Sequence, residues 1–121
     1  MKLQFLEFEN TGDDELHPTW EAMASVRPEH RDALKAELTG LLSALPRWLG
    51  EPPCPLDDGG RWDLWLQAQW DGQTPVTLDT TTGGAGWRVW DASLPDRWLT
   101  LTVTLAAEAS TAEVLRQHLG L

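Results

Sequence analysis

The chain has 121 residues, of which 41% are hydrophobic and 23% charged, a composition that is typical of a folded globular protein and excludes a wholly disordered chain. It carries 19 acidic and 9 basic residues, a formal net charge of −10, which argues against a nucleic-acid or anionic-membrane partner because phosphate contacts need basic groups. No segment approaches the roughly 20 apolar residues that cross a bilayer. We expect one domain over residues 1–121.

The single cysteine, Cys54, excludes an intramolecular disulfide, and a reducing compartment is the simplest inference. The N-terminal residues lack the apolar run of a signal peptide because Gln4, Glu7 and Glu9 interrupt it. Together these features predict a cytoplasmic protein.

The first half of the chain predicts a strand and two helices. Residues 2–9 alternate, with bulky side chains on both faces, and predict a strand that is central or covered on both sides. Pro18 is suited to begin a short helix through about Ser25, with Trp20 and Met23 on its inner side.

A long amphipathic helix is predicted over residues 28–45, ended by Pro46. Gly40 either allows close packing on a sheet or is merely tolerated. The apolar stripe consists of Leu34, Leu38, Leu41, Leu42 and Leu45, and the opposite, polar face carries Arg31, Lys35 and Glu37. Residues 50–60, with three prolines and two glycines at their end, predict an irregular loop.

The second half predicts strands joined by turns. Residues 61–70 alternate, with Trp62, Leu64, Leu66, Ala68 and Trp70 on one face, and Asp71-Gly72 is a hairpin signal. Residues 75–82 predict the returning strand, and residues 87–92 either continue it past a bulge or form a separate strand. Residues 97–105 predict a further strand whose apolar face consists of Leu99, Leu101, Val103 and Leu105.

A capping-box pattern at residues 110–113 predicts the start of a final helix. The predicted fold class is therefore α+β: an antiparallel sheet of about four to five strands in β-α-β-β-β-α order, with the long helix packed on one face.

Tryptophan usage is unusual, with 8 Trp against 2 Phe and no Tyr. Counting with a period of two places Trp65, Trp90 and Trp98 on the face opposite the apolar rows, where Asp63 and Arg88 also lie. Three interpretations remain open for these indoles: cross-strand stacking or cation–π contacts on an open face, a partner-binding surface, or burial beneath the C-terminal helix.

Motifs for chemistry are weak throughout. The three histidines lack metal-ligand spacing, Cys54 has no activating base near it in sequence, and the glycines of residues 83–86 lack the lysine of a phosphate loop. We predict no catalytic residue, no metal ligand and no cofactor.

These observations favour a protein-interaction module over an enzyme: an adaptor, or an inhibitor or immunity-type protein, that binds a basic surface of another protein. The predicted binding residues are Trp65, Trp90, Trp98, Arg88 and Asp63. The alternative is a small-molecule-binding or enzymatic domain with a tryptophan-lined pocket, where Asp63, Arg88 and Asp91 would converge. A homodimer that packs sheet against sheet is a third hypothesis.

Overall fold

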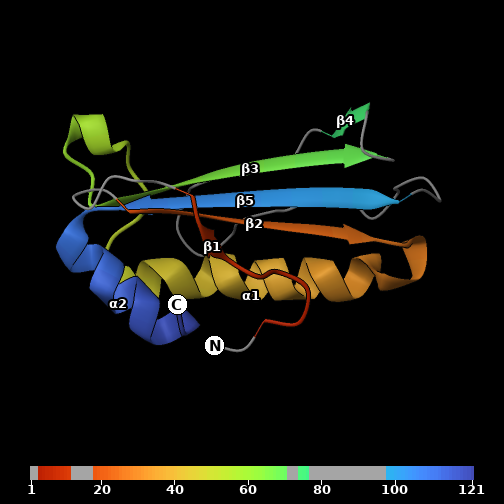
Figure 1. Ribbon diagram of the computed structural model, residues 1–121, viewed down its shortest axis with the longest axis horizontal. Helices are drawn as coiled ribbons and strands as arrows, with labels where there is room; N and C mark the ends of the chain where they lie inside the picture. The colour runs from red at the N-terminus through yellow and green to blue at the C-terminus, as the bar shows by residue number, and fades with distance from the viewer. Residues whose placement is uncertain (1–2, 12–17, 71–73, 77–97) are drawn as a thin grey trace.

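The computed structural model describes residues 3–11, 18–70, 74–76 and 98–121. One sheet lies on one side of the molecule and two helices lie on the other (Figure 1). The elements are β1 (Glu9–Asn10), β2 (Thr19–Val26), a 3-10 turn (Pro28–His30), α1 (Arg31–Leu49), a second 3-10 turn (Leu56–Asp58), β3 (Trp62–Trp70), β4 (Thr74–Val76), β5 (Leu99–Ala107) and α2 (Ala109–Leu119). The predicted α+β class is confirmed.

The sheet has the strand order β1-β2-β5-β3-β4, and every neighbouring pair is antiparallel. The last strand in sequence, β5, therefore lies at the centre, between β2 and β3. Because β2 and β3 are both antiparallel to β5, they run in the same direction. The chain passes from β2 to β3 through α1, which lies across the face of the sheet (Figure 1).

The central strand, β5, has an apolar inner side that is almost completely buried. Leu99, Leu101, Val103 and Leu105 are at most 1% exposed, while Thr100, Thr102 and Thr104 alternate with them and are half-buried. This pattern confirms the strand predicted over residues 97–105 from Leu99 onward, and β5 continues two residues further, to Ala107; residue 97 lies outside the described residues. Trp62, at 1% exposure, and Ala68 likewise confirm the inner face of the strand predicted over residues 61–70.

The helix predicted from Pro18 to about Ser25 is wrong, because these residues form β2. Trp20, Ala22, Ala24 and Val26 are all buried, and the residues between them point away from the core. The helical prediction depended on Trp20 and Met23 sharing a face, whereas Met23 is 61% exposed. Ala22 and Ala24 are small enough to pack in either a helix or a strand, so they did not distinguish the helical period from the strand period.

The strand predicted over residues 2–9 is also largely wrong. Only Glu9 and Asn10 pair with β2, as an edge strand rather than a central one. The preceding residues 3–8 have no regular secondary structure, although Leu6 and Phe8 are buried in the core. We refer to residues 3–8 as the N-terminal segment.

The predicted apolar stripe of α1 is confirmed, since all five of its leucines are at most 1% exposed. The prediction that Pro46 ends the helix is wrong: α1 continues to Leu49 and ends at Gly50, whose φ of 79° is left-handed. A proline removes one backbone hydrogen bond from a helix interior. Here Trp48 and Leu49, which follow it, pack against the core and favour continuing the turn.

The final helix, α2, lies on the same side of the sheet as α1 (Figure 1). Its buried residues Ala112 and Leu115 belong to the same core cluster as the leucines of α1. The hypothesis that this helix covers the tryptophan-bearing face is therefore wrong. The capping box is also wrong in its register, because Glu108 is the N-cap and its Oε1 accepts hydrogen bonds from the hydroxyls of Ser110 (2.9 Å) and Thr111 (3.2 Å).

Strands β3 and β4 pair antiparallel, with Trp70 opposite Thr74. The predicted turn at Asp71-Gly72 and the strand predictions beyond Val76, up to residue 92, lie outside the described residues. Pro75 lies in β4, whose described pairing is with β3 alone, in keeping with the preference of proline for edge strands.

Replacing Gly60 with Ala is expected to destabilise the fold by about 1–3 kcal/mol, because the new Cβ would lie 2.6 Å from the Cys54 carbonyl carbon and closer still to its oxygen. Gly40→Ala is the matched control: nothing lies within 4 Å of the Cβ, so helix propensity should stabilise the protein by up to about 1 kcal/mol. Urea unfolding of both variants measures the difference. Equal changes in the free energy of unfolding for the two variants would contradict the close approach of Gly60 to the Cys54 carbonyl group.

Candidate interaction surface and cleft

The sheet face turned away from α1 and α2, here called the outer face, is defined by the strand register. Directly opposite residues on neighbouring antiparallel strands share a face. The outer face therefore consists of Thr19, Glu21, Met23 and Ser25 of β2; Thr100, Thr102, Thr104 and the buried Ala106 of β5; Asp63, Trp65, Gln67 and Gln69 of β3; and Glu9 of β1.

Large apolar side chains lie exposed on this face. Met23 is 61% exposed and Trp65 is 50% exposed. Trp98 immediately precedes β5 and lies two positions before Thr100, so the alternation of the strand places it on the same face; it is 46% exposed. In the described part of the chain, these are three of the four large hydrophobic side chains classed as exposed, the other being Leu121. Exposed apolar residues are therefore concentrated here.

The exposed indoles are spread along the face rather than stacked on each other. Trp65 lies opposite Thr104, which is six residues from Trp98, a spacing of roughly 20 Å along a strand. Ring contact between the two is excluded at this distance. Met23 lies between them, opposite Thr102. Trp98 instead has the guanidinium of Arg27 5.3 Å from its ring centroid.

The charged residues in these outward strand rows are all acidic. Glu9 and Glu21 lie directly opposite each other, an arrangement of like charges that is destabilising by itself. Asp63 lies two residues before Trp65, and its Oδ1 accepts a hydrogen bond of 2.8 Å from the N–H of Leu64. The outer face therefore combines apolar groups with negative charge.

Basic groups lie at the margins of the outer face. Arg27 covers Trp98, as described above. Arg61, just before β3, lies 3.7 Å from a carboxylate oxygen of Glu51 and 3.9 Å from one of Glu108. Because its side chain is 65% exposed, these pairs contribute little to stability.

Three of the five predicted binding residues can be placed. The structure brings Asp63, Trp65 and Trp98 to the outer face, with Asp63 and Trp65 as neighbours on β3 and Trp98 toward the opposite end. Arg88 and Trp90 lie outside the described residues, as does Asp91. By contrast, Trp62 points into the core, where its Nε1 donates a hydrogen bond of 2.9 Å to the carbonyl of Glu51.

A second feature, which the sequence did not reveal, is a carboxylate clamp on the N-terminal segment. The backbone N–H groups of Gln4, Phe5 and Leu6 all donate to the carboxylate of Glu37 on α1. The bonds from Phe5 and Leu6 to Oε2 are both 2.9 Å. Glu37 was predicted on the solvent-facing side of the helix, and no local pattern marks it as the acceptor for a segment more than thirty residues away.

The end of α2 is held by a ring stack. The imidazole of His118 lies parallel to the indole of Trp48 on α1, with ring centroids 4.5 Å apart and an angle of 6° between the planes. Earlier in α2, the guanidinium of Arg116 lies 5.3 Å from the ring centroid of the buried Trp20. These contacts fix α2 against both α1 and the sheet.

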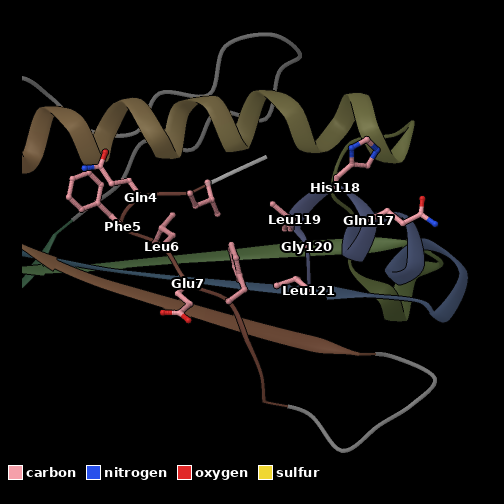
Figure 2. A pocket seen from close by; sticks show the side chains of 11 residues that line it. Gln4, Phe5, Leu6, Glu7, Gln117, His118, Leu119, Gly120 and Leu121 are labelled. Atoms are coloured by element: carbon pink, nitrogen blue, oxygen red, sulfur yellow. The ribbon is translucent and has the colours of Figure 1, made fainter.

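A cleft of about 730 Å³ separates the N-terminal segment from the end of α2. Figure 2 shows the two walls, residues 3–8 on one side and residues 117–121 on the other. No tryptophan is among the described residues that line this cleft, so its described lining differs from the tryptophan-lined pocket of the alternative hypothesis.

Groups for metal or thiol chemistry are sparse in the part of the chain that the structure covers. No cluster of three or more His, Cys, Asp and Glu side chains there could hold a metal ion. Cys54 is half-buried in the loop before β3 and its N–H donates to the carbonyl of Trp62. No helix within the same residues has the length and apolar character to span a membrane.

Comparison with known proteins finds no matching family model, no matching curated protein and no matching solved structure.

Truncating Leu101 and Trp65 separately tests the two faces of the sheet. Leu101→Ala should cost about 2–5 kcal/mol, because Leu101 is fully buried in the core. Trp65→Ala should cost less, because half of this side chain remains in water in the folded protein. Equal losses in denaturant titrations would contradict the assignment of the faces.

Removing the Glu37 clamp should destabilise the protein through the amides that it leaves unpaired. Glu37→Ala is expected to cost about 1–3 kcal/mol, since the N–H groups of Phe5 and Leu6 are partly buried. Glu113→Ala is the matched control, because its exposed pair with Arg116 contributes only about 0.2–0.5 kcal/mol. Thermal or urea unfolding that ranks the two variants equally would show that the clamp contributes nothing.

Proposed function

We propose that this protein is a protein-interaction module, an adaptor or an inhibitor or immunity-type protein, that binds a basic surface of another protein on its outer face. The observation that carries the proposal is the concentration of exposed Met23, Trp65 and Trp98 on a face whose outward strand charges are acidic.

The apolar groups would supply most of the binding free energy. Tryptophan is among the residues enriched in interface hot spots, and a rigid indole loses little side-chain entropy on binding. Trp65 is flanked by polar residues of moderate size, with Thr104 directly opposite and Gln67 two positions along the same strand. Such a setting leaves the ring accessible to a partner without a continuous hydrophobic patch.

The acidic groups would make binding selective for a basic partner and would increase the rate of association. A formal charge of −10 attracts a basic protein at long range. At short range, an arginine or lysine placed over Glu9 and Glu21 would relieve the repulsion between these two carboxylates. A basic partner therefore fits the outer face better than a neutral or acidic one.

This proposal is preferred to the tryptophan-lined pocket because Trp65 and Trp98 are too far apart to line one small site. The homodimer is less favoured, since two copies placed face to face would bring the acidic outer faces together.

Affinity isolation from a cell extract, followed by reconstitution with the purified partner, tests the proposal. The partner should be basic, and its binding should weaken as salt rises. Trp65→Ala should lower the affinity by at least about thirtyfold, as expected of a hot spot, and Glu21→Lys should slow association. Leu121→Ala and Glu113→Lys are the matched controls on the helical side.

Two results would overturn this function. One is a partner whose affinity is unchanged by both outer-face variants but is lowered by the helical-side controls. The other is a stable dimer in sizing chromatography that Trp65→Ala dissociates, which would assign the outer face to self-association.

A further inference from the structure

We propose that the cleft between the N-terminal segment and the end of α2 binds a small organic ammonium ion that carries a hydrocarbon group. This site is separate from the outer face, because both of its walls are held on the helical side of the sheet by contacts to α1.

The cleft is held open by a spacing that α1 imposes. Glu37 clamps the N-terminal segment and Trp48 stacks on His118 of α2. These two residues are eleven positions apart, which is about 16 Å along a helix and within about 20° of the same side. The two walls are therefore attached to one rigid element at separate points, so they are not free to collapse together.

The walls themselves are anchored in the core. On one side, Leu6 and Phe8 are 3% and 8% exposed. On the other, Leu115 is 1% exposed and lies two residues before Gln117, the first residue of α2 that lines the cleft. A volume of about 730 Å³ is within the range of small-ligand sites, roughly 300–1,000 Å³, and such sites are usually preformed.

The lining favours a cation. The carbonyl groups in the last turn of a helix have no intrahelical N–H partner, and they carry the negative end of the helix dipole. In this cleft that turn includes Gln117 and Leu119. Glu7 lines the opposite wall, and the lining residues that the structure describes, 3–8 and 117–121, include no lysine or arginine. An ammonium group donates hydrogen bonds and is attracted by both features.

The same lining also favours an apolar body on the ligand. Leu3, Phe5, Leu119 and Leu121, which are all at least partly exposed, supply hydrocarbon surface around the polar groups. Figure 2 shows Leu6 on one wall facing Leu119 and Leu121 on the other. A short alkylammonium ion matches this combination, whereas an inorganic cation would leave the apolar side chains without contacts.

Titration with n-hexylammonium, followed by the amide chemical shifts of the protein, tests the site. Saturable shifts are expected at Leu6, Phe8 and Leu119, and n-hexanoate, which has the same chain length and the opposite charge, should bind at least about tenfold more weakly. Leu121→Lys would place a cation in the cleft and should lower the affinity at least about tenfold. Because Leu121 is 39% exposed, this variant should fold normally.

Two variants of the outer face control for the change in net charge. Gln69→Lys adds the same charge as Leu121→Lys, and Glu9→Gln removes the same charge as Glu7→Gln. Glu7→Gln should weaken hexylammonium binding by about two- to fivefold, the effect of one exposed charge, whereas Gln69→Lys and Glu9→Gln should change it by less than that. Equal binding of hexylammonium and hexanoate, equal effects of the paired variants, or shifts confined to the outer face would each overturn the proposal.

Discussion

The position of β5 at the centre of the sheet determines how the rest of the molecule is arranged. From Leu99 to Leu105, its inward residues are leucines and a valine that are nearly inaccessible to water, and its outward residues are threonines. One face of the strand must therefore be covered, and the leucine stripe of α1 covers it. The other face needs no cover, because threonine is compatible with both a strand and water. The register with β5 then determines which residues of β2 and β3 face the core and which face outward.

The strands and helix with strong periodicity were predictable from the sequence. The alternation of β3 and β5 is long, and the leucine spacing of α1 matches one helical stripe, so each pattern is hard to satisfy in another conformation. In β2 the signal was weak, because Ala22 and Ala24 pack equally well in a strand or a helix. The position of β5 between β2 and β3 was not predictable, since it depends on pairing between residues far apart in the chain.

Some features of the candidate surface were likewise predictable from the sequence, and others were not. The outward direction of Trp65 and Trp98 followed from parity along a single strand, and their exposure agrees with it. The role of Glu37 could not be predicted, because an acidic residue on the polar side of an amphipathic helix normally faces water. In the structure, Glu37 is half-buried. Only the path of the N-terminal segment, which brings three amides to this carboxylate, gives it a structural role. The stack of Trp48 on His118 likewise depends on how α2 meets α1.

An acidic surface also explains how the protein can keep apolar groups in contact with water. Exposed Met23 and Trp65 on an open sheet would favour association between copies, but a net charge of −10 opposes it at long range. The carboxylates of Glu9, Glu21 and Asp63 oppose it locally as well, because they lie on the same face as the exposed side chains. A partner that brings positive charge removes both barriers at once. Under the proposed function, the arrangement would therefore discriminate between a second copy of the chain and a basic protein, although both would cover the same apolar groups.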